Sequence, residues 1–288
     1  MADVAVVTDS THYLPRELTE REGIHLVPLY VNWDGHTDRE SELDLGAFYG
    51  HLVSAAALPT TSQPSVGDFL AAYEPLLAAG ADIVSVHISG GISGTCGAAE
   101  AARAQLVERG IAPERIVVVD SASACGGLGL VALAAAHAAR AGASAGEAAA
   151  AALALRREMV IWFAVDTMEF LRRGGRVGAA RAWVGTALKI KPILTLESQI
   201  TPVERVRTAS RAFERLVEHL EERRAQGCDA FAVQHIRDPE RAQRLVERGR
   251  TIYGRDPLFV SEIGPVIGTH VGPGLLGAAG VRSALLGP

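Results

Sequence analysis

The spacing of apolar and polar residues predicts strands and helices that alternate along the first half of the chain. Short runs rich in Val and Ile are typical of buried strands. We expect them at Val4 to Thr8, Ile24 to Val31, Ile83 to Ile88 and Ile116 to Val119. Helical periodicity covers residues 43–54 and 66–79 and two later stretches that end at Arg109 and about Ala141. Apolar strands separated by helices predict a parallel sheet covered on both faces.

The pattern changes near Ser144, where Ser144 and Glu147 have the spacing of a capping box at the start of a helix that runs to Glu158. Later strands are expected at Val160 to Val165, Lys189 to Leu196, Ile200 to Val206, Ala230 to Gln234 and Leu258 to Ile263. Helices are expected over Ser210 to Ala225 and, after the Asp238 cap and Pro239, to about Ile252. The change favours two domains, residues 1–155 and 156–288.

The composition mainly excludes classes of protein and kinds of site. The chain has 288 residues, of which 48% are hydrophobic and 21% charged, so it can bury a sizeable core and is not expected to be disordered. A net charge of −5 argues against binding to nucleic acid, which usually requires a basic surface. Cys96, Cys125 and Cys228 lie far apart in the sequence and form no metal-ligand spacing, so we expect reduced thiols and no metal.

No targeting or membrane segment is expected. The N-terminus opens directly into a strand pattern, without the basic and apolar regions of a signal peptide. The most apolar stretch, Leu128 to Ala139, contains His137 and is shorter than the ~20 residues of a membrane span. The sequence therefore predicts a cytoplasmic protein with no integral membrane segment.

A first polar loop, Pro59 to Ser65, precedes the helix expected at residues 66–79. Ser65 is expected to cap this helix, because Ser is a preferred residue at that position. Thr61 and Ser62 lie too early in the chain to cap it. They are candidates for binding a ligand, and a simple turn is the open alternative.

A second loop, Ser89 to Thr95, follows a buried strand and precedes a helix. Ligands of open α/β sheets bind at the carboxyl ends of strands, and the N-terminus of a helix favours an anion. The residues from Gly90 to Gly97 match no dinucleotide, P-loop or hydrolase-elbow motif. Ser93, Gly94 and Thr95 are therefore candidates for binding a small anion, with a turn capped by a hydroxyl as the alternative.

A third loop carries His270 among Gly264, Gly268, Gly272 and Gly274. Glycines let the backbone approach a ligand closely, and an imidazole can donate a hydrogen bond to a carboxylate. Ligand contact and a purely structural role are both compatible with this pattern.

Other polar residues receive simpler interpretations. His87, on an apolar strand, is expected to be a core histidine with satisfied hydrogen bonds. Asp9 and Asp120, each followed by Ser at a strand end, are expected to cap helices or to support a site. The arginines of the glycine-rich turn at residues 170–178 are either solvated or form a docking surface; they are Arg172, Arg173 and Arg176.

Taken together, the loops give a sequence that resembles the DegV family, which includes the fatty-acid-binding subunits of bacterial fatty acid kinase. The matching segments occur in order over essentially the whole chain. They are Val7 to Thr11, Thr61 to Ser65, Ile92 to Thr95, Val119 to Ser121, Leu171 to Val177, Ile190 to Leu194 and Gly268 to Gly274. One departure is Gly90-Gly91, where the family often has Ser-Ser or Ser-Gly.

The resemblance implies an α/β fold of two domains, a three-layer N-terminal domain with a parallel sheet and a C-terminal domain with a mixed sheet. It implies a long-chain fatty acid whose tail is buried in a tunnel near the domain junction. The family's carboxylate ligands correspond to Thr61, Ser93 and His270, with Ser62, Gly94 and Thr95 in the same motifs. In this hypothesis the chain needs no cofactor.

The resemblance also implies a partner, a separate kinase subunit with a Dha-kinase-like domain that phosphorylates the bound acid. Docking arginines of the family correspond to Arg176 and to Arg205 or Arg207. The chain lacks a Walker A motif and a protein-kinase motif set, so ATP and Mg²⁺ are assigned to the partner. Two alternatives remain: a stand-alone small-molecule phosphotransferase or hydrolase that uses Ser93 and His270, and a regulatory lipid-responsive protein without a kinase partner.

Overall fold

The computed structural model describes residues 3–55, 57–183 and 190–287. The chain forms two compact units, which are described separately below. Unit 1 consists of Met1–Tyr30, Ser62–Glu158 and Ala284–Pro288, and unit 2 of Val31–Thr61 and Met159–Ser283.

The chain passes between the units four times, whereas the sequence pattern favours a single division between residues 155 and 156. Residues 31–61 belong to unit 2 because long-range hydrogen bonds attach them there. The Tyr49 hydroxyl donates to the carbonyl oxygens of Ile263 and Gly264, and Glu40 Oε1 accepts from the Val266 amide at 2.7 Å. The second crossing separates Thr61 from Ser62.

A four-stranded parallel sheet forms the centre of unit 1, in the order β2-β1-β6-β7. The strands are β1 (Val4–Asp9), β2 (Ile24–Val27), β6 (Asp82–His87) and β7 (Ile116–Asp120). Val7 and Ile83 on one face, and Val6 and Val84 on the other, are all buried. The predicted parallel sheet is therefore confirmed, and it is covered on both faces.

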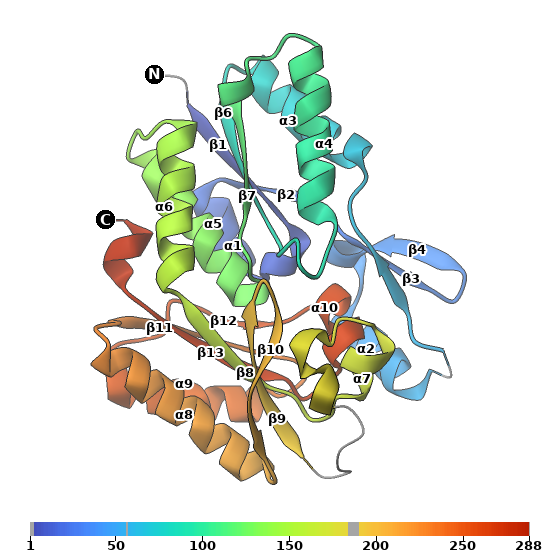
Figure 1. Cartoon of the computed structure of the whole chain (residues 1–288), viewed down its shortest axis with the longest axis vertical. Coiled ribbons are helices and arrows are strands. Elements are labelled where there is room, and N and C mark those ends of the chain that lie inside the picture. The colour runs from blue at the N-terminus through green and yellow to red at the C-terminus, as the bar shows by residue number, and fades with distance from the viewer. Residues whose placement is uncertain (1–2, 56, 184–189, 288) are drawn as a thin grey trace. The chain divides into compact units, whose positions relative to one another are not determined.

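Helices cover the sheet of unit 1 on its two faces (Figure 1), so the unit has three layers. On one face lie α3 (Val66–Ala78) and α4 (Thr95–Glu108), and on the other α5 (Cys125–Arg140) and α6 (Ala145–Glu158), with the short α1 (Arg16–Glu22) beside α5. Phe69 and Tyr73 of α3 and Leu106 of α4 supply large side chains to the core on their face. On the other face, the Gly and Ala residues of α5 allow it to pack closely against α6.

Two helix starts in unit 1 have the caps expected from the sequence. Ser65 Oγ accepts from the Asp68 amide while Asp68 Oδ2 accepts from the Ser65 amide, which completes a capping box. Ser144 and Glu147 form the same reciprocal pair before α6. Each box satisfies backbone N–H groups that the helix itself leaves without a partner.

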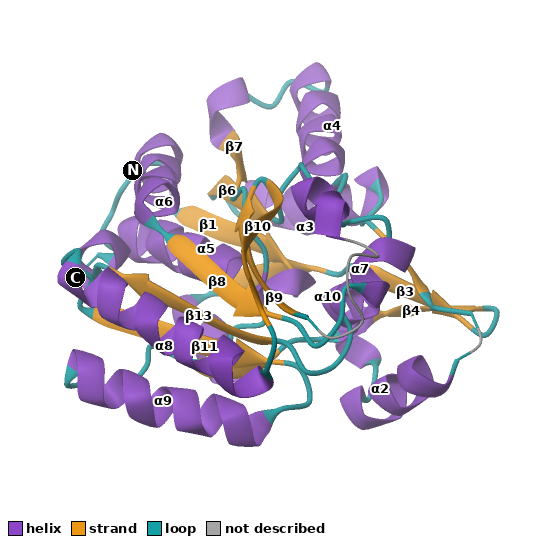
Figure 2. Cartoon of the chain, turned by 60° about the horizontal axis from the view of Figure 1, so that its bottom comes forward, coloured by secondary structure: helices purple, strands orange, loops and turns teal. Residues whose placement is uncertain are grey.

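Unit 2 contains a six-stranded mixed sheet in the order β10-β9-β8-β13-β11-β12. All neighbouring strands are antiparallel except β11 and β12, which are parallel. The strands are β8 (Val160–Ala164), β9 (Lys191–Glu197), β10 (Gln199–Val206), β11 (Ala230–His235), β12 (Val260–Glu262) and β13 (Leu276–Val281). Two helices, α8 (Ala209–Ala225) and α9 (Pro239–Tyr253), lie side by side against one face (Figure 2).

Shorter elements complete the chain. They are α2 (Leu45–Ser54), α7 (Glu169–Arg173), α10 (Pro265–Val271), a three-stranded sheet of β3 (Tyr30–Trp33), β4 (His36–Arg39) and β5 (Thr60–Ser62), and the 3₁₀ turns Ser10–His12, Glu40–Glu42, Pro113–Arg115, Gly178–Trp183 and Ser283–Leu286. Strand β5 carries both Thr61 and Ser62, so the second crossing between the units falls within it.

Several expected elements differ from the structure. The strand expected at Ile24 to Val31 is two strands, β2 and β3, because Pro28 lacks the N–H that a continuous ladder requires. The loop expected around His270 is the short helix α10, which Pro265 begins and Gly272 ends. Strands β4, β5 and β13 have no counterpart in the sequence analysis, and β5 lies in the loop expected at Pro59 to Ser65. Lys189, expected to begin a strand, lies outside the described residues; β9 is described from Lys191.

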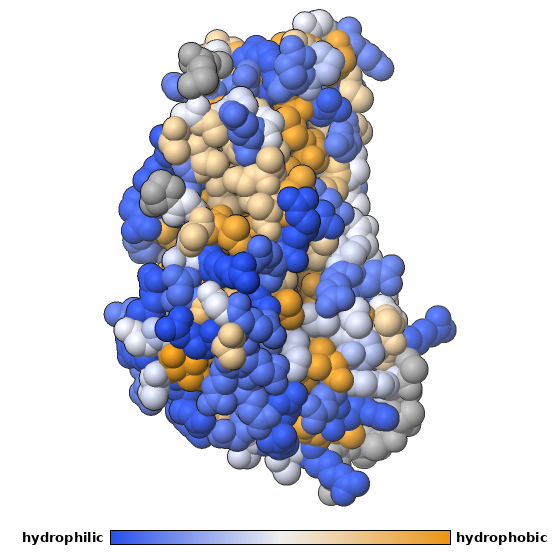
Figure 3. Space-filling view, turned by 60° about the vertical axis from the view of Figure 1, so that its left-hand side comes forward, coloured by the Kyte–Doolittle hydropathy of each residue, from blue (hydrophilic) through white to orange (hydrophobic). Residues whose placement is uncertain are grey.

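The face of the molecule in Figure 3 shows strongly hydrophobic residues as small separate groups among hydrophilic ones. Weakly hydrophobic residues gather in its upper part, where the alanine-rich α6 lies. Within the described ranges, no helix combines the length and the apolar character needed to cross a membrane.

Replacing Gly249 of α9 by Ala is expected to lower the unfolding free energy by about 1–3 kcal/mol, the usual range for overpacking a core. A Cβ at this position would lie 2.3 Å from the Phe231 ring, which is fully buried. Gly50→Ala is the matched control, because Gly50 is a helical glycine of the same unit with nothing within 4 Å of its Cβ position. The control should gain up to about 1 kcal/mol through helix propensity. Urea denaturation measures both; equal stabilisation of the two variants would contradict the packing argument.

Candidate functional site

Two groups of polar side chains, one in each unit, contain the residues that the sequence singles out. The group in unit 1 lies at the carboxyl ends of β1, β6 and β7 and includes the Ser89–Thr95 loop. The group in unit 2 contains Thr61 and His270.

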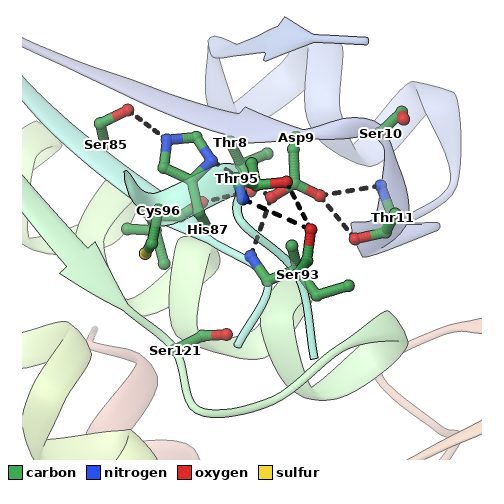
Figure 4. A network of polar contacts seen from close by, with 12 residues as sticks. Thr8, Asp9, Ser10, Thr11, Ser85, His87, Ser93, Thr95, Cys96 and Ser121 are labelled. Carbon is green, nitrogen blue, oxygen red and sulfur yellow. Dashed lines mark hydrogen bonds and ion pairs between the residues drawn. The ribbon is translucent and has the colours of Figure 1, made fainter. Parts of the chain in front are cut away.

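A fully buried chain of hydrogen bonds underlies the group in unit 1 (Figure 4). The Tyr73 hydroxyl donates to Ser85 Oγ at 2.6 Å, and Ser85 Oγ lies 2.6 Å from His87 Nε2. The other ring nitrogen, Nδ1, lies 3.1 Å from Asp9 Oδ2. Because a carboxylate only accepts, His87 Nδ1–H donates to Asp9 and Ser85 O–H donates to Nε2. All four side chains are thus engaged, and the interpretation of His87 as a satisfied core histidine is confirmed.

The Asp9 carboxylate accepts further hydrogen bonds from the backbone. Its Oδ2 accepts from the Ile88 amide at 2.8 Å, and its Oδ1 accepts from the Thr11 amide at 3.1 Å. Burial by itself would raise the pKa of Asp9, but its hydrogen bonds from His87, Thr11 and Ile88 hold that pKa below the ordinary value. The ionised carboxylate therefore ties the end of β1 to the end of β6 and supports the loop that follows.

Ser85, His87 and Asp9 occur in the order of a hydrolase triad, but they do not form an accessible nucleophile. Ser85 is completely buried, and its oxygen already accepts from Tyr73. A nucleophile has to reach its substrate, so this arrangement is structural.

The Ser89–Thr95 loop places two hydroxyls at the start of α4 (Figure 4). Ser93 Oγ lies 2.9 Å from Thr95 Oγ1 and accepts from the Thr95 amide at 3.4 Å. Ser93 is half-buried, whereas Thr95 is fully buried. Gly94 occupies the N-cap position without a side-chain cap, so the first turn of this 14-residue helix keeps its preference for an anion.

The glycines of this loop permit two close approaches. A Cβ on Gly94 would lie 1.9 Å from Gln63 Oε1, so the Gln63 side chain lies against the Ser93–Thr95 motif within unit 1. A Cβ on Gly90 would lie 3.0 Å from Asp120 Oδ2, which accepts from the Gly90 amide at 3.2 Å. Asp120 thereby shapes the loop, and its contact explains a glycine at position 90.

In unit 2, the structure brings Thr61 and His270 together. Thr61 lies on β5, and His270 lies in the last turn of α10; Thr61 Oγ1 is 2.8 Å from His270 Nε2. The other ring nitrogen, Nδ1, is buried and has no hydrogen-bond partner among the described residues. Ser62, the next residue of β5, is exposed and belongs to unit 1.

The turn after α7 packs directly on the His270 ring. A Cβ on Gly174 would lie 2.5 Å from His270 Nδ1, and a Cβ on Gly272 would lie 2.2 Å from the Phe170 ring. Only glycine allows both approaches, and Gly272 also has a φ of +74°. Burial, with a smaller contribution from the Arg176 charge, lowers the pKa of His270 to about 4. The imidazole is therefore neutral at pH 7.

The three arginines expected to dock a partner lie on the surface of unit 2. Arg176 is exposed and its Nη1 donates to the Gly174 carbonyl at 2.7 Å. Arg205, on β10, places its guanidinium 5.2 Å from the centroid of the Trp183 ring. Arg207 is exposed just beyond the end of β10. Their role in docking stays a prediction.

Unit 2 also contains a polar pocket of about 450 Å³ that the sequence analysis missed. It is lined by the β3–β4 hairpin, by His51 of α2 and by residues 57–60. Thr60 lines this pocket but Thr61 and His270 do not, in keeping with the alternation of side chains along β5. The pocket is therefore separate from the Thr61–His270 pair.

The described residues contain no group of three or more His, Cys, Asp or Glu side chains able to hold a metal ion. Burial raises the pKa of the Cys96 thiol to about 12 and also raises that of Cys228. Both thiols are protonated at neutral pH and are poor nucleophiles.

Comparison with known proteins gives a consistent result at the level of sequence. A family model, described as uncharacterised proteins of the DegV family, matches residues 3–282. The protein DegV of Bacillus subtilis is 38% identical over 279 residues, which cover 96% of this chain and 98% of that protein. A DegV domain-containing protein of Streptomyces coelicolor is 43% identical over 278 residues, covering 95% of this chain and 96% of the relative.

Solved structures agree with the sequence matches. The DegV crystal structure from Bacillus subtilis, described as a fatty acid binding protein, superposes with a TM-score of 0.87 at 37% identity and covers 98% of this chain and 100% of its own. A DegV family protein from Thermus thermophilus, described by its fatty acid binding, has a TM-score of 0.87 at 35% identity. The match covers 97% of this chain and 99% of that protein.

The neutral, buried state of His270 has a consequence for the dependence of stability on pH. Its pKa is about 4 in the folded chain, below the ordinary value of 6.5, so unfolding at pH 5 takes up a proton at this residue. Its contribution is fully present above about pH 6.5 and is lost as the pH falls toward 4. His270→Gln should therefore reduce the slope of the unfolding free energy against pH by up to about 1.4 kcal/mol per pH unit. Denaturant titrations at pH 5, 6 and 7 measure how the unfolding free energy changes with pH. Equal pH dependence in the variant and the wild type would refute this contribution of His270.

Proposed function

Because the chain belongs to the DegV family, we propose that it binds a long-chain fatty acid non-covalently and presents the carboxylate to a separate ATP-dependent kinase subunit. The observation that carries the proposal is the pairing of the Thr61 hydroxyl with the neutral imidazole of His270. The fatty acid binding described for the relatives from Bacillus subtilis and Thermus thermophilus supports the same ligand class.

The proposal takes Thr61, Ser93 and His270 as the carboxylate ligands. Ser62, Gly94 and Thr95 are taken as further ligand contacts, since they belong to the same motifs. A buried carboxylate is costly without hydrogen-bond donors, and hydroxyls, an imidazole and helix-end N–H groups can supply them. These donors orient a carboxylate without the bidentate ion pair that an arginine would form, so the oxygen keeps its nucleophilic character toward a phosphoryl group.

The hydrocarbon tail would supply most of the affinity. Each buried CH₂ contributes roughly 0.8 kcal/mol, so a chain of sixteen or eighteen carbons is retained without a covalent bond. The head group then has to be held only in position.

The phosphoryl donor belongs to the partner in this proposal. The chain has no Walker A or protein-kinase motif set, so ATP and Mg²⁺ are assigned to a kinase subunit with a Dha-kinase-like domain. The product of that subunit would be an acyl phosphate. Arg176, Arg205 and Arg207 are proposed to meet acidic groups of the partner, because exposed arginines are frequent in interfaces.

Native mass spectrometry of the purified protein is expected to show a fatty acid at about one per chain. Thr61→Val should weaken the binding of oleate by roughly 10-fold or more, the loss of one hydrogen bond to a charged group. Thr60→Val is the matched control, because the neighbouring threonine lines the separate polar pocket and should leave the affinity unchanged. Equal affinities for both variants and the wild type would exclude Thr61 as a head-group ligand. A covalent adduct at Ser93 would favour the hydrolase alternative.

With a bacterial fatty acid kinase subunit, ATP and oleate, the protein should support the formation of acyl phosphate, whereas either component alone should not. Arg205→Ala and Arg207→Ala are each expected to raise the KM for the loaded protein by about 10-fold or less, the usual effect of losing one charge at the rim of an interface. Arg250→Ala serves as the control, because Arg250 is paired with Asp256 on the surface of the same unit. Calorimetry with ATP and the isolated chain should detect no binding. Tight ATP binding would oppose the two-component scheme.

A further inference from the structure

We propose that Arg176 is a positioning residue for the head group: acting through the turn at Gly174, it holds His270 in the tautomer that carries its hydrogen on Nε2. In this tautomer the imidazole donates to Thr61, and the hydroxyl hydrogen of Thr61 remains available for an anion. The anion's identity as a carboxylate rests on the proposed function, while the tautomer is a property of the ligand-free chain.

The hydrogen bond between Thr61 and His270 has two possible directions. With Nε2 only 2.8 Å from Thr61 Oγ1, either the ring N–H donates to the hydroxyl oxygen or the hydroxyl donates to a bare Nε2. In the second arrangement Thr61 donates its only hydroxyl hydrogen to Nε2 and cannot donate it to an anion. The environment of the other nitrogen, Nδ1, decides between the two, because a neutral imidazole carries one hydrogen.

The surroundings of Nδ1 disfavour a hydrogen on that atom. Nδ1 is buried and has no hydrogen-bond partner among the described residues, and Gly174 lies against it so closely that a Cβ would be 2.5 Å away. A buried N–H without an acceptor costs the desolvation of a polar donor. The Arg176 charge disfavours a proton on the imidazole, and its guanidinium is bonded to Gly174, the residue that lies against Nδ1.

Arg176 is held in a position to act on His270. Its Nη1 donates to the Gly174 carbonyl at 2.7 Å, and the Gly174 amide donates to the Phe170 carbonyl at 2.8 Å. Gly175, with a φ of +72°, turns the chain between them. The guanidinium is therefore fixed to the same peptide that covers the imidazole.

Other charged groups on the elements around His270 do not offset Arg176. Glu169 of α7 is paired with Arg172 at 2.6 Å, and α10 and β5 carry no charged side chain. Glu40 accepts from the Val266 amide, at the opposite end of α10 from His270. The balance around the ring is thus cationic, which favours a neutral imidazole with a bare Nδ1.

The test is the long-range ¹H–¹⁵N spectrum of the histidines in the ligand-free full chain, with His270 assigned by its loss in His270→Gln. In the wild type at pH 7, we expect Nδ1 of His270 to resonate as an unprotonated nitrogen and Nε2 as a protonated one. Arg176→Gln should raise the pKa of His270 and shift both nitrogens toward a mixture of tautomers, and Arg176→Lys should restore most of the wild-type signature. Arg173→Gln is the matched control, an arginine of the same segment that should leave the signature unchanged.

Oleate affinity provides the second readout. Arg176→Gln should weaken binding by about 2- to 10-fold, the range of one hydrogen bond, and Arg173→Gln should not. A protonated Nδ1 in the wild type, or an unchanged His270 signature in Arg176→Gln, would overturn the positioning role even if oleate binds. If the wild type fails to bind oleate, the proposed function is wrong instead. The spectra still show which ring nitrogen of His270 carries the hydrogen. Dispersed amide spectra of each variant show that it has folded.

Discussion

The hydrogen bond between Thr61 and His270 joins segments that lie 209 residues apart in the sequence, and it ties β5 to α10 within unit 2. For the bond to form, residues 31–61 have to leave the parallel sheet of unit 1 and pack with the second half of the chain. Tyr49 and Glu40 secure that segment through the backbone on either side of the α10 N-terminus. The pair therefore depends on the path of residues 31–61 into unit 2 as well as on the two side chains.

The parts of the fold that the sequence predicts are those with a local cause. Strands β1, β6 and β7 are rich in Val and Ile because both faces are covered, and the caps at Ser65 and Ser144 follow from hydrogen bonds only three residues apart. Strand β13 could not be predicted in the same way. Its small residues show no strand pattern, and Gly280 is required there because a Cβ would lie 2.4 Å from the Tyr253 hydroxyl of a distant helix.

The candidate site shows the same division between local and distant causes. The sequence identifies Thr61, Ser93 and His270 as polar residues among glycines, and it identifies His87 as a core histidine. It does not show that Gly174 of the 170–178 turn lies against the His270 ring, because that contact joins two segments far apart in the sequence. For the same reason Arg176 reads as a surface residue alone, although its guanidinium is bonded to the peptide over the imidazole.

Gly174 meets the His270 ring with main-chain atoms alone, and Gly272 meets the Phe170 ring in the same way. A wall of this kind cannot be widened by truncating a side chain, and any larger residue collides with the ring of His270 or of Phe170. Attempts to engineer a different head-group preference would therefore have little to vary on this side of the imidazole. Substitutions that change the preference would have to be made at Thr61 and at positions that contact the rest of the ligand.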